Sequence, residues 1–182
     1  RTAQVSRQFG GNSQNGAYGD SVHELDWSTG EILDAIKDAG IADRTVIVFM
    51  SDNGAVENHG GSNLPMSGWG YSTDEGGMRV PCIVKWPGIT PDGYECDTLV
   101  TAMDFLPTFA SAAGVQIPDN SVDGYDAIDV FSQPDKQNSP YEAFYYYQME
   151  QLQAVRSGKW KLKLGLDHKI DHGRRDLGSV EE

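Results

Sequence analysis

A continuous apolar run followed at once by a polar turn is the feature that most constrains the fold of this chain. Residues 45–50 (TVIVFM) show no alternation of polar and apolar side chains, and the first four are β-branched. Such a run is typical of a strand buried on both faces, as in parallel sheets covered by helices. We therefore predict an α/β fold, with the turn Ser51-Asp52-Asn53-Gly54 at the carboxyl end of this strand.

The turn itself offers two oxygen ligands to a cation. Ligands of α/β sheets bind beyond the carboxyl ends of the strands, which is where Asp52 and Asn53 would lie. A carboxylate and an amide oxygen suit Ca²⁺ or Mg²⁺ better than Zn²⁺. The alternative is a purely structural Asx-turn, because Asp-Asn-Gly is a favourable turn sequence without any metal. Since two ligands cannot fill six to eight positions, a metal would need further ligands from elsewhere.

The remaining pattern predicts an α/β body over residues 1–140 and a small antiparallel sheet with a charged tail over residues 141–182. Asp20 is the predicted N-cap of the first helix, and Ser157-Gly158 is a predicted two-residue hairpin turn. The Gly-rich segment 54–79 is long enough to be a functional loop. The predicted helices are residues 20–37 and 99–113, and the predicted strands are residues 45–50, 80–86, 143–148, 153–156 and 159–164.

Charge argues against two classes of partner. Fourteen Lys and Arg face 27 Asp and Glu, which gives a net charge of −13. Nucleic acids and anionic membranes are bound by cationic surfaces, so neither is an expected partner. No apolar stretch is long enough to span a membrane, and the first residues do not have the pattern of a signal peptide.

Other chemistry-bearing residues allow structural interpretations. His59 lies in the loop, where it either contacts an anion or acts as an acid or base, or is simply solvated. Glu75 and Arg79 are predicted to form an ion pair at the base of the loop. Cys82 and Cys96 either form a disulfide or are one buried strand cysteine and one incidental cysteine. His168 and His172 have helical spacing in a charged tail and are interpreted as solvated.

Several short motifs, in order, resemble the sulfatase family. The strand and turn at residues 45–54 resemble the family's metal-binding strand, and the resemblance extends over residues 16–164. The subfamily that it most resembles is that of arylsulfatase A and N-acetylgalactosamine-6-sulfatase. The motifs are residues 16–20 (GAYGD), 26–33 (DWSTGEIL), 45–54 (TVIVFMSDNG), 75–81 (EGGMRVP), 86–88 (WPG), 104–108 (DFLPT) and 154–161 (AVRSGKWK).

The resemblance implies an alkaline-phosphatase-like fold, with a mixed sheet between helices and a small C-terminal antiparallel sheet. It implies hydrolysis of sulfate esters at a calcium site, with a formylglycine nucleophile. Asp52 and Asn53 match the family's second pair of metal ligands. Calcium would hold a sulfate oxygen and spread the charge that develops at sulfur.

The sequence departs from the family pattern in three ways, one of which is that the tail after Leu164 does not resemble the family's usual continuation. No C/S-x-P-x-R motif for formylglycine occurs, and the family's early Asp pair and its upstream histidine are also absent. We expect all three before Arg1, so that the chain corresponds to the C-terminal half of a sulfatase and is inactive alone. The family's sulfate-binding lysine stands five residues before Glu-Gly-Gly, and this position is Gly70. His59 and Arg79 are the nearest cationic substitutes.

Two further functions compete with hydrolysis by a sulfatase. Gly70 favours a non-catalytic sulfatase-like protein that binds sulfated carbohydrate, whereas the superfamily also contains phosphatases and phosphodiesterases. The Glu-Gly-Gly-Met-Arg motif favours the sulfatases over the latter. Substrate selectivity is expected in loops 54–74 and 115–140. The resemblance implies work outside the cytosol, and the absence of any N-x-S/T sequon favours a periplasmic or secreted protein over a lysosomal one.

Overall fold

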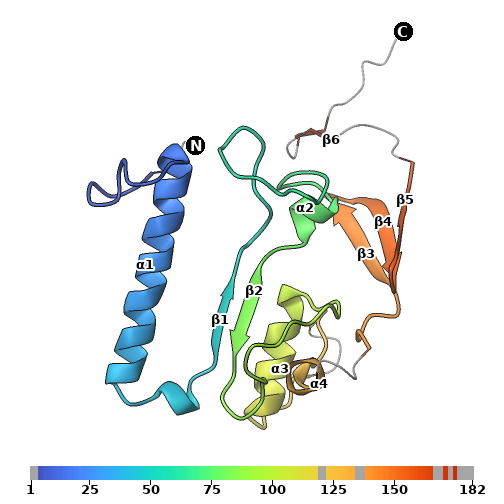
Figure 1. The fold of residues 1–182 in the computed structure, drawn as a ribbon. Coiled ribbons are helices and arrows are strands. Elements are labelled where there is room, and N and C mark those ends of the chain that lie inside the picture. Colours follow the sequence, from blue (N-terminus) through green and yellow to red (C-terminus); the bar gives the residue numbers. More distant parts are fainter. Residues whose placement is uncertain (1–3, 119–121, 134–137, 166–169, 172–173, 176–182) are drawn as a thin grey trace.

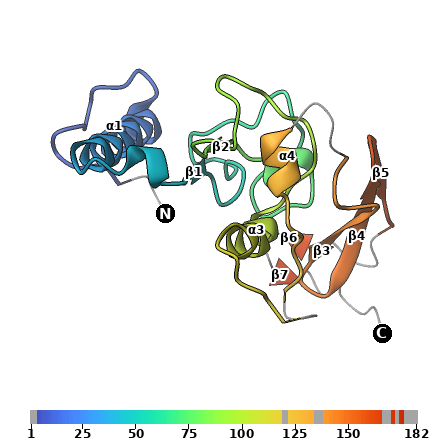
Figure 2. The same cartoon turned by 90° about the horizontal axis from the view of Figure 1, so that it is seen from below.

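The computed structural model describes residues 4–118, 122–133, 138–165, 170–171 and 174–175, and side chains up to residue 165. Helix α1 lies on one side of the strand pair β1–β2, and the C-terminal sheet lies on the other side (Figure 1). Helices α3 and α4 lie in the lower part of the molecule beside β2, whereas α2 lies higher, next to β3 (Figure 1). Figure 2 shows the same elements from below. The helices are α1 (Gly16–Asp38), α2 (Glu75–Met78), α3 (Phe105–Ala112) and α4 (Ile128–Ser132), with 3-10 turns at Ala42–Arg44 and Ala102–Asp104.

The strands form three antiparallel groups. The first pairs β1 (Ile47–Met50) with β2 (Cys82–Lys85), in register from Ile47↔Lys85 to Met50↔Cys82. The second has the order β3-β4-β5, with β3 at Phe144–Gln148, β4 at Gln151–Ser157 and β5 at Trp160–Lys163. The third is the short pair β6 (Ile170–Asp171) and β7 (Arg174–Arg175). The small C-terminal antiparallel sheet expected from the sequence is therefore confirmed.

The strand at residues 45–50 was expected in a parallel arrangement, and its described neighbour corrects this. β2 pairs with β1 in the antiparallel direction. All four β1 residues are half-buried instead of fully buried. A continuous apolar run reports burial on two faces but carries no information on the direction of the neighbouring strand, which is why the expectation failed.

Four local expectations also need correction. Asp20 is not the N-cap of the first helix, because the helix starts four residues earlier and Asn15 is the N-cap. Ser157 pairs with Trp160, so the two-residue hairpin turn is Gly158-Lys159. The segment 115–140, which was expected to be a loop, contains helix α4. Both cysteines are free and exposed, so neither the disulfide nor the buried strand cysteine is present. His168, His172 and most of the charged tail lie outside the described residues.

The lower core combines aromatic rings with one buried carboxylate. Phe105 stacks on Phe131 with ring centroids 5.9 Å apart, and Phe131 also contacts the buried Trp86. Asp104 is fully buried and accepts hydrogen bonds from the backbone N–H of Thr101 and Tyr125, at 2.6 and 2.8 Å. The hydroxyl of Tyr141, 2.6 Å away, donates a third, and burial followed by this bond raises the pKa of Tyr141. These bonds satisfy the buried charge, which would otherwise be costly.

The long helix leaves much of its apolar face uncovered in the described part of the chain. Val22, Leu25 and Ile32 are exposed by 47%, 54% and 59%. The first turns are better held, because Asp20 accepts the backbone N–H of Gly11 and Ser13 at 2.8 and 2.6 Å. No helix among the described residues is long and apolar enough to cross a membrane.

Candidate functional site

The polar turn lies at the end of β1, as the sequence predicted. The last ladder pair joins Met50 to Cys82, and one further hydrogen bond runs from the Ser51 N–H to the Pro81 carbonyl at 3.2 Å. The backbone leaves the sheet directly after this bond. The strand pair therefore fixes where Asp52 stands.

Both turn side chains retain an oxygen without a protein partner in the described part of the chain. Asp52 is exposed, and its Oδ1 accepts the Asn53 N–H at 2.9 Å. Asn53 donates through Nδ2 to the Gly54 carbonyl at 2.8 Å, which leaves its Oδ1 as an acceptor. The two bonds join neighbouring residues, so neither is the bond to the N–H two residues on that defines an Asx-turn. The turn has, in addition, two oxygens of the kind that hard cations bind.

Among the described residues (4–118, 122–133 and 138–165), no three His, Cys, Asp or Glu side chains come close enough together to hold a metal ion. Asp52 and Asn53 are the chemically suitable pair, and a full calcium shell needs several more oxygens. The donor set fits a hard cation in type. That other parts of the protein complete the shell remains a prediction.

Glycines let the loop backbone pack directly against the turn. Gly54 donates its N–H to the Gly77 carbonyl at 3.0 Å, and a Cβ on Gly54 would overlap the carbonyl of Gly76. Gly70 is buried, donates its N–H to Ala55 at 2.8 Å, and lies beneath the Gly54 carbonyl. A Cβ on Gly70 would overlap that carbonyl and would lie 3.1 Å from Asn53 Nδ2. No side chain fits at position 70 in this packing, so a lysine there would need the loop to move.

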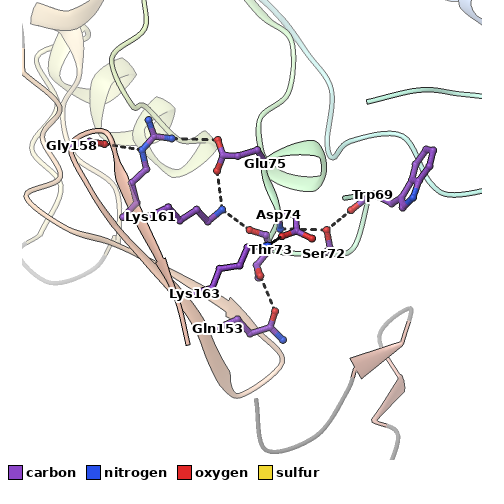
Figure 3. A network of polar contacts seen from close by, with 10 residues as sticks. Trp69, Ser72, Thr73, Asp74, Glu75, Gln153, Gly158, Lys161 and Lys163 are labelled. Atoms are coloured by element: carbon purple, nitrogen blue, oxygen red, sulfur yellow. Dashed lines mark hydrogen bonds and ion pairs between the residues drawn. The ribbon is translucent and has the colours of Figure 1, made fainter. Parts of the chain in front are cut away.

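An ion-pair group joins the base of the loop to the C-terminal sheet (Figure 3). Glu75 Oε1 lies 2.9 Å from Lys161 Nζ, and its Oε2 lies 3.5 Å from Arg156 Nη1. The Lys161 ammonium also donates to the Thr73 carbonyl at 2.6 Å and lies 3.7 Å from the ring centre of Tyr146. Burial, followed by the charge of Glu75, raises the pKa of the Tyr146 hydroxyl.

The predicted ion pair between Glu75 and Arg79 is therefore wrong. Helix α2 ends at Met78, and Arg79 has an extended backbone. Residues four apart share a face only while the helix continues, so the two side chains diverge. Arg79 instead pairs with Asp97 at 3.5 Å, and both side chains are largely exposed.

A second set of contacts holds the segment that follows Gly70. Gln148 Nε2 donates to the Tyr71 carbonyl at 2.6 Å, and Gln153 Nε2 donates to Gln148 Oε1 at 3.2 Å. The hydroxyl of Thr73 donates to Gln153 Oε1 at 2.8 Å, and Lys163 pairs with Asp74. Sequence reasoning missed these residues. The one sequence signal for them was that the predicted C-terminal strands carry Gln and Lys side chains. Such side chains indicate that one face of this sheet contacts polar groups.

His59 is exposed in the loop, and its backbone N–H bonds to the Val56 carbonyl at 3.3 Å. It lies with Val56, Glu57 and Tyr71 around a pocket. Its role in binding substrate stays a prediction. Arg79, the other cationic substitute considered for the missing lysine, is not among the residues that line this pocket.

Comparison with known proteins gives matches along most of the chain. The family model described as Sulfatase matches residues 1–115, and that described as N-sulphoglucosamine sulphohydrolase, C-terminal, matches residues 71–164. Steryl-sulfatase of Homo sapiens is 39% identical over 160 residues, which cover 83% of this chain and 27% of that protein. N-acetylgalactosamine-6-sulfatase of Canis lupus familiaris is 40% identical over 162 residues, which cover 86% of this chain and 30% of that protein.

A solved structure shows the same arrangement of elements. Ps i-CgsB in complex with k-i-k-neocarrahexaose superposes with a TM-score of 0.76 at 31% identity, over 90% of this chain and 39% of that one. The chain thus spans 27% and 30% of the length of the two relatives above. A match to the family model over residues 1–115, well over half of the sequence, shows that the chain belongs to the sulfatase family.

Proposed function

We propose that the full-length protein hydrolyses sulfate esters, with Asp52 and Asn53 among the ligands of a Ca²⁺ ion. The observation that carries this is the pair of unengaged oxygens on a turn fixed at the end of β1. Membership of the sulfatase family supports it. Ca²⁺ is preferred to Mg²⁺ because mixed carboxylate and amide oxygens suit its larger, more flexible shell.

In this proposal the ion supplies electrostatic stabilisation of the charge that develops on the sulfate oxygens. The chain's own residues provide the negative charge of Asp52, the neutral oxygen of Asn53 and a rigid backbone beneath both. A formylglycine in another part of the protein provides the nucleophile. Residues 52–77 therefore bind the ion and orient the sulfate ester, whereas the nucleophile comes from another part of the protein.

The proposed substrate is a sulfated carbohydrate. The support is the likeness to Ps i-CgsB, whose structure holds k-i-k-neocarrahexaose. The proposed location is outside the cytosol, periplasmic or secreted, as the family resemblance and the lack of N-x-S/T sequons favour.

The second candidate is a non-catalytic protein that binds sulfated carbohydrate. Gly70 favours it, because the packing against Gly54 leaves no room for the cationic side chain expected at that position. Measuring whether the full-length protein releases sulfate from a model substrate separates the two candidate functions. Release of sulfate from p-nitrophenyl sulfate by the full-length protein supports hydrolysis, and binding without release supports the alternative.

The metal assignment is tested by calcium titration of the full-length protein and its Asp52→Ala and Asn53→Ala variants. Asp52→Ala is expected to weaken calcium binding at least tenfold, about 1.4 kcal/mol, because a charged ligand is lost. Asn53→Ala removes a neutral oxygen and should have a smaller effect.

Asp126→Ala is the matched control, because Asp126 is an exposed loop carboxylate that accepts the backbone N–H of Ile128 at 3.0 Å. Like Asp52, it is exposed and accepts a backbone N–H from a residue close in sequence, but it lies in another region. If all three variants bind calcium like the wild type, Asp52 has a structural role only and the metal assignment is wrong.

A further inference from the structure

A pocket of about 390 Å³ lies beside the candidate metal turn and is lined by Val56, Glu57, His59 and Tyr71. The loop that carries it lies between the end of β1 and helix α2 (Figure 1). Gly70 connects the two sites, because its Cβ would lie 3.1 Å from both Asn53 Nδ2 and Val56 Cγ2. The pocket wall at Val56 and the proposed metal ligand Asn53 therefore both lie next to the same glycine.

A larger hollow, of about 570 Å³, does not compete for this role. Its lining includes Asp43, Lys85, Trp86 and Thr90. These residues lie at the start of β1 and the end of β2, which the antiparallel register places at the opposite end of the strand pair from Asp52. A ligand there would not reach the turn.

Tyr71 has an unusual backbone for a bulky residue. Its φ is +71°, and its side chain is exposed, with 61% of its surface accessible. A non-glycine residue in this region costs about 1–3 kcal/mol unless its surroundings hold it there. The Gln148 side chain, bonded to the Tyr71 carbonyl at 2.6 Å, does so from the C-terminal sheet. The ring is exposed, so its own burial does not offset this cost, and its surface beside the pocket is free to meet a ligand.

The pocket's chemistry suits a hydroxyl-bearing ring. A tyrosine ring provides a rigid, flat surface with a polar tip, and such surfaces bind ligands that are apolar on one face. His59 and Glu57 add a hydrogen-bond donor and acceptors at the pocket's edge. Glu57 is negatively charged and would repel a sulfate group, so the group that enters here is the uncharged part of the ligand.

We propose that this pocket is a subsite for a saccharide ring of the sulfated carbohydrate. The ring stacks on Tyr71, its hydroxyls bond to His59 and Glu57, and the sulfate group points toward Asp52 and Asn53. The proposal rests on the proposed function and deepens it, because it assigns the residues that recognise the sugar.

The test uses the full-length protein and an array of sulfated and desulfated oligosaccharides, followed by titration calorimetry with the best-bound glycan. Tyr71→Gly is the decisive variant. Glycine adopts a positive φ without strain, so the melting temperature should not fall, while glycan affinity should drop about tenfold through loss of the stacking surface. Tyr71→Phe should bind within about threefold of the wild type, since the ring is retained.

Tyr145→Ala is the matched control, because Tyr145 is a 55% exposed tyrosine on strand β3 that does not line the pocket. It should leave glycan affinity unchanged. The proposal is overturned if the wild type binds no glycan, or if Tyr71→Gly binds as tightly as the wild type.

Hydrolysis of p-nitrophenyl sulfate by the wild type is measured separately. Glycan binding that depends on Tyr71, without hydrolysis, would leave the subsite standing and refute the sulfatase activity. Hydrolysis without such binding would do the reverse.

Discussion

Helix α1 and the C-terminal sheet β3–β5 are held in opposite ways. The sheet buries Tyr146 and Ala154, which are 4% and 1% exposed, and sends charged and amide side chains to the loop at Thr73 and Glu75. Helix α1 exposes an apolar stripe, and its described contacts are mainly polar and near its first turns. The sheet thus packs its buried face within the described residues and supports the loop, whereas the helix has an apolar face that the described residues do not cover.

The difference shows that apolar residues at helical spacing predict a helix but do not show that its apolar face is buried. The apolar period of α1 predicted the helix correctly although its apolar side chains remain exposed. An uncovered apolar face of this size favours association with another surface. The sheet, in contrast, is tied by pairs of residues some 80 positions apart in sequence, such as Arg156 and Glu75.

The largest expected effect concerns the apolar stripe of α1. Residues 1–182 purified alone should self-associate, because Leu25 and Ile32 are more than half exposed. The double variant Leu25→Glu/Ile32→Lys, which keeps the net charge, should shift the chain toward monomer. Light scattering after size exclusion measures the mass. A wild type that stays monomeric at about 100 μM, within the micromolar to millimolar range in which exposed apolar surface drives aggregation, would refute the expectation.

The next effect concerns the polar support of the loop. Lys161→Met should lower the free energy of unfolding by about 2 kcal/mol, since Glu75 would keep only its longer contact to Arg156. Lys161→Arg should recover most of the loss, because it restores the charge. Chemical denaturation of the full-length protein measures both.

Arg79→Met is the matched control for this ion pair. The Arg79–Asp97 pair is exposed by 65% and 98%, so its loss should cost less than about 0.5 kcal/mol. Equal losses for Lys161→Met and Arg79→Met would show that the Glu75 group does not support the loop.

The smallest effect is a pH dependence at the start of α1. Hydrogen bonds from the backbone of Gly11, then of Ser13, lower the pKa of Asp20 below its ordinary value. A lowered pKa in the folded state adds stability above the unfolded pKa, and this is lost as pH falls through the folded pKa.

The melting temperature of wild type should therefore exceed that of Asp20→Asn at pH 7, and the gap should close below about pH 4. Asp26→Asn, an exposed position on the same helix, is the control. A gap that stays constant from pH 7 to about pH 2 would contradict the role of the Asp20 charge.

Local patterns predicted local elements well. Five predicted elements overlap observed ones of the same type. They are the helix at residues 20–37, the strand at residues 45–50 and the three strands of the C-terminal sheet. Their periodicity and turn residues are encoded over a few positions. The Asp-Asn turn was found for the same reason, since a strand and the polar residues after it are contiguous.

Long-range partners were beyond sequence reasoning. Glu75 was assigned to Arg79 because both belong to one short segment, whereas its actual partners come from the far strands β4 and β5. The direction of β2 and the enclosure of Gly70 likewise depend on how separate segments meet. Tyr71 passed unnoticed because its distinguishing property is a backbone angle, not a side-chain pattern.

The antiparallel pair β1–β2 closes the segment 51–81 at its base, through Met50↔Cys82 and the bond from Ser51 to Pro81. Once the ends of a loop are joined in this way, doubling its length costs only about 0.6 kcal/mol. The stretch at residues 57–62, which excludes Val56 beside Gly70 and Asn63 with its bonds to Ala55 and Gly68, can therefore be lengthened or replaced while Asp52 and Glu75 keep their positions. Under the proposed function, the turn at Asp52 holds the ester's charge, whereas Glu57 and His59 contact the sugar from a stretch that the strand pair does not fix. Exchange of that stretch should then change sugar preference without moving the metal turn.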